Sequence, residues 1–157
     1  MKTALLLHNI RSAHNVGSLF RTSDAAGVSE IYLTGYTPTP VDRFGRTQKE
    51  IAKTALGAEQ NIHWTALNTP GPIIKRLKKE GWIIVGVEQD ERAIDYRAFV
   101  AHGPTLFILG NEVLGISAAL KKQCDVIVEI PMRGAKESLN VGVAGGIVLF
   151  QSISAST

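Results

Sequence analysis

Short apolar runs alternate along the chain with longer stretches in which apolar residues recur at helical spacing. The short runs are almost continuously hydrophobic, which is typical of strands covered on both faces. This alternation favours an α/β fold, in which helices flank a parallel sheet. The predicted strands are Ala4–Leu7, Glu30–Thr34, Trp82–Val87, Thr105–Leu109 and Val126–Ile130. The predicted helices are Asn15–Ala26, Arg46–Leu56, Pro72–Lys79, Ser117–Gln123 and Leu139–Ser152.

Residues at the element boundaries agree with this assignment. Asn15 and Ser117 are suitable N-caps. Gly27, Gly57 and Gly81 fall where helix C-caps are expected. The stretch GYTPTPVDRFG (35–45) reads as a turn-rich loop after a strand. No repeat or linker divides the sequence, so we expect a single domain over residues 1–157.

Composition narrows the class of protein. Of 157 residues, 45% are hydrophobic and 20% charged, as in an ordinary folded domain. No apolar run reaches the roughly 18 residues of a membrane span, and the four-residue run in MKTALLLHNIRS is too short for a signal peptide. The single Cys124 excludes an internal disulfide, and the four scattered His residues indicate no structural zinc. We therefore expect a cytoplasmic protein without a metal.

The charge is only mildly basic, with a formal net charge of +3 and a pI of 9.1. This balance is compatible with a polyanionic partner without establishing one. Basic residues cluster at 43–53, 74–80 and 132–137. The middle cluster reads as the solvated face of an amphipathic helix, with Ile73, Ile74 and Leu77 facing inward.

Candidate chemistry follows the strands, because ligands of open parallel sheets bind beyond the carboxyl ends of the strands. The segments there are LTGYTPTP, GVEQD, LGNEVLG and IPMRGAKES. They suit a mononucleotide-like ligand. The chain has neither G-x-G-x-x-G after its first strand nor G-x-x-x-x-G-K-[ST], which disfavours an ordinary NAD fold and a P-loop fold. Glu88 could serve as a ribose-binding acid, although that signal is weak without the glycine fingerprint.

Three segments have unusual composition for mere packing: residues 9–27, 106–117 and 130–150. In the first, Arg21 could form a surface ion pair with Asp24 or belong to a site. In the second, glycines suit a tight turn near a ligand, and Glu112 could be a helix-end carboxylate or a site acceptor.

The third segment brings Glu137, Ser138 and Asn140 to the start of the last helix, where free N–H groups can meet a ligand. That helix carries Gly142, Gly145 and Gly146. A glycine inside a helix costs up to about 1 kcal/mol relative to alanine, so we expect these glycines to allow another element to approach closely.

Taken in order, the three segments resemble one family. N-x-G-x-x-x-R (15–21), L-G-N-E-x-x-G (109–115) and I-P-M-x-G-x-x-x-S-L-N-V (130–141) are similar to the three motifs of the SPOUT superfamily. The similarity is closest to its SpoU branch, the TrmH-like RNA ribose 2′-O-methyltransferases. TPTP and KTALGAE (53–59) also look like that branch.

The resemblance implies a fold, a cofactor and partners. The fold would be α/β with a C-terminal deep trefoil knot, and the last helix would pack beside a cofactor loop and at a homodimer interface. The cofactor would be S-adenosylmethionine, and the partner RNA, either tRNA or rRNA, with no membrane. Many relatives carry an extra N-terminal RNA-binding domain, and we expect no separate domain of that kind in this chain. The expected cofactor-binding residues are Val87, Leu109, Gly110, Ile130, Met132, Ser138 and Leu139.

The resemblance also implies catalytic residues, namely Arg21, Asn15, Glu112, Ser138 and Asn140. Because a guanidinium stays protonated, we expect Arg21 to hold an RNA phosphate and stabilise the developing alkoxide, rather than act as a base. Asn15 would hold the ribose or Arg21, and the other three would shape the pocket. Gly142 and Gly145 stand where the family often has Ser or Ala, which should loosen the helix rather than remove chemistry.

Three other functions remain open. The chain could be an RNA-binding protein that has the fold without catalysis, although the polar motif residues are all present. It could be a base methyltransferase of the same superfamily, which would need a base-reading acid that the sequence does not indicate. A nucleotide-dependent oxidoreductase is disfavoured by the missing glycine fingerprint.

Overall fold

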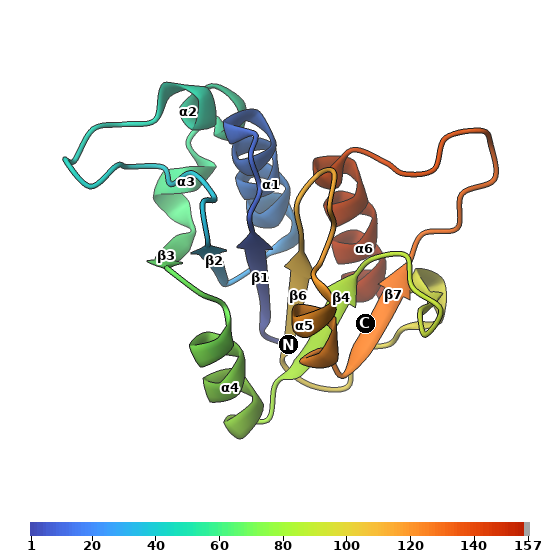
Figure 1. Ribbon diagram of the computed structural model, residues 1–157. Coiled ribbons are helices and arrows are strands. Elements are labelled where there is room, and N and C mark those ends of the chain that lie inside the picture. Colours follow the sequence, from blue (N-terminus) through green and yellow to red (C-terminus); the bar gives the residue numbers. More distant parts are fainter. Residues whose placement is uncertain (156–157) are drawn as a thin grey trace.

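A wholly parallel sheet forms the centre of the computed structural model, which describes residues 1–155 (Figure 1). Within those residues it has seven strands in the order β3-β2-β1-β6-β4-β7-β5. The predicted α/β fold with a parallel sheet is confirmed. The strands are β1 (Thr3–His8), β2 (Glu30–Thr34), β3 (His63–Leu67), β4 (Ile83–Val87), β5 (Ile94–Asp95), β6 (Thr105–Leu109) and β7 (Val126–Glu129).

Helices cover both faces of this sheet. One face carries α1, α2, α3, α6 and the short helix η1, and the other carries α4 and α5 (Figure 1). No helix in residues 1–155 has the length and apolar content needed to cross a membrane. The helices are α1 (Ala13–Ala26), α2 (Lys49–Ala55), α3 (Ala58–Asn61), α4 (Gly71–Lys79), η1 (Tyr96–Ala98), α5 (Ala118–Lys122) and α6 (Val141–Ala155).

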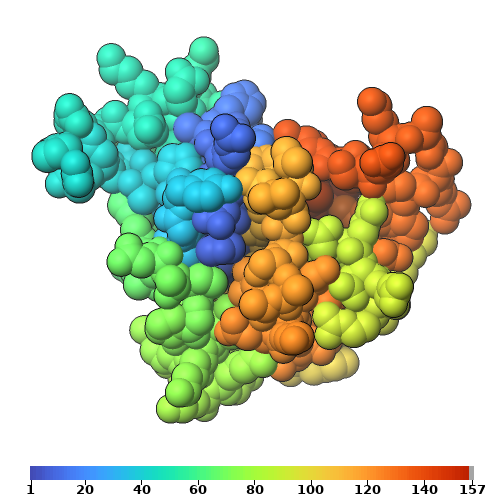
Figure 2. Space-filling model, viewed as in Figure 1, coloured from blue at the N-terminus to red at the C-terminus, as the bar shows by residue number. Residues whose placement is uncertain are grey.

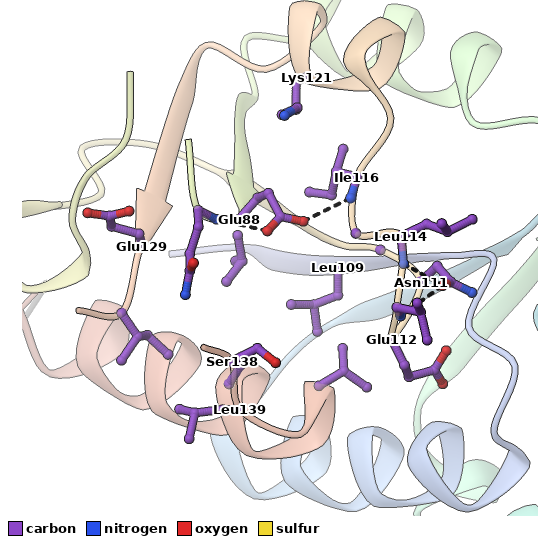
Figure 3. Close-up of a pocket in the computed structure, with 18 of the residues that line it drawn as sticks. Glu88, Leu109, Asn111, Glu112, Leu114, Ile116, Lys121, Glu129, Ser138 and Leu139 are labelled. Atoms are coloured by element: carbon purple, nitrogen blue, oxygen red, sulfur yellow. Dashed lines mark hydrogen bonds between the residues drawn. The ribbon is translucent and has the colours of Figure 1, made fainter. Parts of the chain in front are cut away.

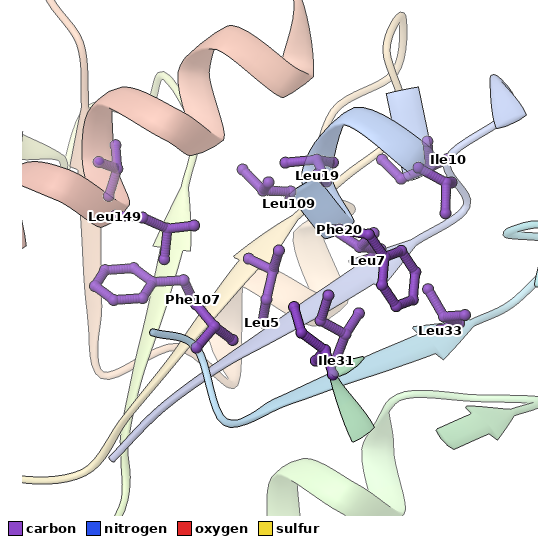
Figure 4. Close-up of a cluster of buried hydrophobic side chains, with 14 of the residues drawn as sticks. Leu5, Leu7, Ile10, Leu19, Phe20, Ile31, Leu33, Phe107, Leu109 and Leu149 are labelled. Carbon is purple, nitrogen blue, oxygen red and sulfur yellow. The ribbon is translucent and has the colours of Figure 1, made fainter. Parts of the chain in front are cut away.

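The core is divided by the sheet into two clusters. Leu5 and Leu7 of β1 point into the larger one, beneath α1 and α6, where Phe20 and Phe107 also lie (Figure 4). Leu6, between them, points to the opposite face beneath α4 and α5. Because alternate strand residues face opposite sides, a strand buried on both sides must be apolar at every position. This explains the continuous apolar runs in the sequence.

The glycines of α6 allow it to pack closely on α1. A Cβ atom at Gly145 would lie 2.7 Å from Leu19 Cδ2 and 2.9 Å from Leu109 Cδ1, closer than carbon atoms pack. A Cβ at Gly142 or Gly146 would meet its nearest neighbour at 3.1 or 3.4 Å, so these positions are less constrained. The predicted close approach is therefore confirmed, and Gly145 is the glycine that requires it.

Several predicted boundaries were wrong. The first helix begins at Ala13, because the Ser12 hydroxyl, not Asn15, caps it by accepting a hydrogen bond from the Asn15 N–H at 3.1 Å. The second begins at Lys49 instead of Arg46, since residues 41–47 form a tight turn. The last begins at Val141 instead of Leu139.

Two strands, β3 and β5, were missed by the sequence analysis. β3 lies at one edge of the sheet and β5 at the other. An edge strand is covered less fully, and in β3 both His63 and Ala66 are exposed, so the run HWTAL lacks the continuous apolar character of the inner strands. β5 has only two residues, too few for any periodic signal.

Candidate functional site

A pocket of about 350 Å³ opens beyond the carboxyl ends of β4, β6 and β7. Its walls are the segments that follow these strands, which form the hollowed region between residues 87–89, 109–116 and 129–144 (Figure 2). The pocket thus lies where the sequence analysis expected a ligand, beyond the carboxyl ends of the strands. All seven expected cofactor-binding residues line it: Val87, Leu109, Gly110, Ile130, Met132, Ser138 and Leu139.

The first wall is a tight loop at residues 110–116. The Asn111 side-chain oxygen accepts hydrogen bonds from the N–H groups of Val113 at 2.9 Å and Leu114 at 2.8 Å. The Gly115 N–H donates to the Asn111 carbonyl at 2.9 Å. A Cβ atom at Gly110 would lie 2.5 Å from the Gly115 carbonyl oxygen, so the loop closes on its own backbone. Gly110 is thus required first by the loop itself, which holds the wall in shape.

Glu88 fixes this loop to the end of β4. Its carboxylate accepts the Ile116 N–H at 2.9 Å, and the side chain lies in the pocket opposite Leu109 and Ser138 (Figure 3). Gly115 adopts a positive φ of 66°, and a Cβ there would collide with the Glu88 carboxylate. Glu88 is the residue that the sequence motifs missed, and its only signal was its place directly after a predicted strand.

The opposite wall is the segment between β7 and α6. The Gln89 amide donates to the Glu137 carbonyl at 2.6 Å, which ties this segment to the end of β4. Ser138 and Leu139 follow directly and turn toward the pocket (Figure 3). The expectation that free N–H groups of the last helix face a ligand is only partly met. The side-chain oxygen of Asn140 accepts hydrogen bonds from Gly142 and Val143 at 2.8 and 3.3 Å and so caps α6 itself.

Three of the expected catalytic residues form a chain of hydrogen bonds across the three motifs. The Asn140 amide donates to the Asn15 side-chain oxygen at 3.1 Å, and the Asn15 amide donates to the Glu112 carboxylate at 3.3 Å. Asn15 is buried on α1, Glu112 lines the pocket, and Asn140 belongs to the segment that forms the opposite wall. The chain therefore joins both walls to the N-terminal end of α1.

Glu112 also accepts the N–H groups of Arg11 and Ser12, each at 3.0 Å, at the start of α1. Burial alone would raise the pKa of this carboxyl. The backbone donors and the Asn15 amide together outweigh that effect and hold the pKa of Glu112 below its ordinary value. The carboxylate therefore stays ionised, and its oxygens are engaged by these hydrogen bonds. This suits a hydrogen-bond acceptor that organises the loop better than a base that transfers a proton.

Arg21 lies apart from this pocket. It is exposed and lines a second hollow of about 540 Å³ between α1, α2 and the last turns of α6, together with Lys53, Leu56 and Phe150. It does not touch Asn15 through a hydrogen bond, and within residues 1–155 it makes no ion pair, so the alternative of a pair with Asp24 is not observed. Four of the five expected catalytic residues are thus brought together, and the fifth is not.

The remaining reactive groups give no second site. Burial raises the pKa of the Cys124 thiol to about 11, which makes it a poor nucleophile, as expected of a packed thiol. In the part of the chain that the structure describes, no three His, Cys, Asp or Glu side chains are grouped to hold a metal ion.

Comparison with known proteins gives one consistent family. Residues 2–150 match the SpoU rRNA Methylase family. The chain is 32% identical over 151 residues to a Staphylococcus haemolyticus protein assigned to the TrmH family of tRNA/rRNA methyltransferases, covering 96% of this chain and 58% of that protein. It is 31% identical over 149 residues to the 23S rRNA (guanosine-2′-O-)-methyltransferase RlmB of Ralstonia nicotianae, covering 95% of this chain and 57% of the relative.

The structural similarity is equally extensive. The crystal structure of an AdoMet-bound rRNA methyltransferase from Sinorhizobium meliloti superposes with a TM-score of 0.85 at 29% identity. The match covers 96% of this chain and 55% of the other. The chain therefore spans somewhat less than three fifths of each of these three proteins.

Proposed function

The chain belongs to the SpoU rRNA Methylase family, and we propose that it transfers a methyl group from S-adenosylmethionine to a ribose 2′-hydroxyl of a structured RNA, tRNA or rRNA. The observation that carries this proposal is the pocket. Seven residues from three separate segments, all expected to bind the cofactor, line one cavity at the carboxyl ends of three neighbouring strands. The 2′-O-methyltransferase relative and the AdoMet-bound structure support the reaction and the cofactor.

The pocket residues fit S-adenosylmethionine. The pocket volume of about 350 Å³ falls in the range of small-molecule sites. Leu109, Ile130 and Leu139 offer apolar surface for an adenine ring, and the Glu88 carboxylate offers an acceptor for hydroxyl groups. When bound, the cofactor supplies an electrophilic methyl group on its sulfonium, so the protein's main task is to position the acceptor.

The chain's own residues would divide this task. Glu112, Asn15 and Asn140 hold the two walls of the pocket at a fixed separation through their hydrogen bonds. Ser138, exposed at the pocket rim, is placed to contact the ribose. Arg21 would grip an RNA phosphate with its planar guanidinium, and its charge would stabilise the alkoxide that forms as the hydroxyl loses its proton. The proton would pass to the phosphate or to water.

A homodimer would allow the pocket and the hollow that contains Arg21 to act together. Val143 and Phe150 on α6 and Leu56 after α2 are about half exposed or more, which is unusual for large apolar side chains grouped on one surface. Phe150 and Leu56 line the hollow that contains Arg21. We propose that a second copy covers this face. Arg21 lies outside the pocket of its own chain, so a partner or the RNA must bring the arginine and a pocket together, which supports this proposal.

We further infer that the C-terminal segment forms the knot implied by the family resemblance. β7 lies between β4 and β5, although β5 precedes β7 in the chain. α5 precedes β7 on one face of the sheet, and α6 follows it on the other. This order supports passage of residues 117–155 through the loop that connects β4 to β6.

Methyl transfer itself is the test. The purified chain is incubated with labelled S-adenosylmethionine and, separately, with tRNA and rRNA from a strain that lacks the gene. Alkali cannot cleave beside a 2′-O-methylated ribose, so label in alkali-resistant dinucleotides is the expected result and would identify the RNA class. Label in mononucleotides would overturn the ribose assignment in favour of base methylation. Cofactor binding without transfer to any RNA would favour a binding protein that has lost catalysis.

A further inference from the structure

The loop between β2 and α2 has a projecting tip, residues 41–47, that is exposed from Arg43 onward. In Figure 2 the loop stands out from the body at the upper left. Every residue from Arg43 to Glu50 is exposed, and the Phe44 side chain is 65% exposed. An exposed ring on a projecting loop is available for contact with another molecule, and the groups around it show which kind of molecule it suits.

The tip is nevertheless well ordered by its own hydrogen bonds. The Asp42 carboxylate accepts the N–H groups of Phe44 and Arg46 at 2.8 and 3.0 Å, and the Arg46 side chain at 2.8 Å. Val41 and Thr47 pair across the base of the turn, and Gly45 supplies the positive φ of 77° that closes it. The ring is therefore presented in a fixed position, which lowers the entropic cost of binding.

Two guanidinium groups accompany the ring. The Cζ atoms of Arg43 and Arg46 lie 4.8 and 4.9 Å from the centroid of Phe44. Arg46 is held by Asp42, whereas Arg43 makes no ion pair within the described residues. Asp42 thus holds Arg46 over the ring, whereas the charge of Arg43, which also lies over the ring, is available to a nearby anion. Aromatic rings and guanidinium planes stack on unpaired nucleobases, and a neighbouring arginine can bind the phosphate.

The surroundings have the charge that such a ligand requires. Residues 41–53 contain four basic and two acidic side chains. Lys49 and Lys53 continue the basic surface along α2, and Lys53 lines the hollow that contains Arg21. At the other end of the loop, the Tyr36 hydroxyl accepts a hydrogen bond from the pocket residue Asn111 at 3.0 Å. The tip is therefore connected through α2 to the hollow that contains Arg21, and through Tyr36 to the pocket.

We propose that residues 41–47 form a stacking platform for an unpaired base of the RNA substrate, with Phe44 and Arg46 holding the base and Arg43 its phosphate. The platform deepens the proposed function and depends on it for the identity of the ligand as RNA. It would favour substrates whose methylated nucleotide lies near a single-stranded segment, such as a loop, over continuous duplex.

The test measures binding of the intact chain to two fluorescein-labelled RNAs by fluorescence anisotropy: a 12-nucleotide oligouridine and a 12-base-pair duplex. Stacking of one base is worth about 1–3 kcal/mol, so Phe44→Ala should weaken oligouridine binding by roughly fivefold to a hundredfold. Duplex binding should change by less than about twofold, since the phosphate contacts dominate it. Phe44→Trp should retain the affinity, and Phe44→Leu should lose it as Phe44→Ala does.

Arg43→Ala should reduce the salt dependence of oligouridine binding by about one phosphate contact. Arg97→Ala is the matched control, because Arg97 also lies over an aromatic ring, at 5.9 Å from the Tyr96 centroid, on another part of the surface. It should leave the salt dependence of oligouridine binding unchanged.

Three results would overturn the platform: unchanged oligouridine binding by Phe44→Ala, an equal loss for the duplex, or full affinity in Phe44→Leu. Each variant is also assayed for S-adenosylmethionine binding and, with wild type, for methyl transfer. Absence of transfer in wild type would remove the proposed function, while loss of oligouridine binding in Phe44→Ala would still support the platform.

Discussion

The pocket and the Arg21 hollow lie on the same molecule but differ in how complete they are. The pocket is built by the chain's own hydrogen bonds, from Asn111 within its loop to Glu88 and Gln89 across its walls. The hollow has exposed apolar side chains at Leu56 and Phe150 and an arginine without a carboxylate partner in residues 1–155. The difference agrees with our proposal that one chain forms the cofactor pocket by itself, whereas Arg21 acts together with a second molecule.

The sharpest test of that separation is Arg21→Lys. Lysine keeps the charge but loses the planar fork that binds a phosphate bidentately. We expect kcat/KM for methyl transfer to fall by about a hundredfold to a thousandfold, with the Kd for S-adenosylmethionine unchanged. Calorimetry and a filter-binding transfer assay would measure the two quantities. Near-wild-type turnover would remove the bidentate contact from the mechanism.

The opposite effect is expected of Gly110→Ala. The added Cβ would lie 2.5 Å from the Gly115 carbonyl oxygen, so the loop must open and the pocket wall must move. Cofactor affinity should fall by about a hundredfold, comparable to an overpacking cost of up to about 3 kcal/mol. The control is Gly71→Ala at the start of α4, since a Cβ there meets nothing within 4 Å and Gly71 does not line the pocket. Equal affinities in the two variants would show that the loop is not a rigid wall.

A smaller effect should link the two regions through α1. Asn140→Ala removes both the cap of α6 and the hydrogen bond to Asn15. The free energy of unfolding should fall by about 1–2 kcal/mol, measured by urea denaturation. In a double-mutant cycle with Asn15→Ala, the coupling energy should be about 0.5–1.5 kcal/mol. Strict additivity would mean that the hydrogen-bonded chain does not join the walls.

The smallest effect concerns the pH dependence of stability at the pocket wall. The folded-state pKa of Glu112 lies below its ordinary value of 4.5. A depressed pKa contributes stability above the unfolded-state pKa, and this contribution is lost as the pH falls through the folded-state pKa. Glu112→Gln should therefore be less stable than wild type at neutral pH, by about 1 kcal/mol, and the difference should shrink below about pH 4. A difference independent of pH would contradict the ionised role.

The inner part of the fold could be predicted because its strands are buried on both faces and so are apolar at every position. β3 and β5 could not, since edge strands such as His63–Leu67 do not need that composition. The residues that line the pocket could be predicted from motif resemblance and from the rule that ligands bind at strand ends. The hydrogen bond between Asn140 and Asn15 spans 125 residues of sequence, and the exclusion of Arg21 from the pocket depends on how α1 packs. Neither leaves a local signal.

The place of β7 in the sheet has a consequence for how the chain folds. β7 pairs with β4 on one side and β5 on the other, yet it begins only at Val126. Until that residue has been synthesised, the outer edge of β4 presents unpaired backbone groups, which are a template for association with other chains. Parallel pairing between distant segments is also slow to form. The nascent protein is therefore prone to aggregation until the segment from Val126 onward has left the ribosome and β7 has paired between β4 and β5.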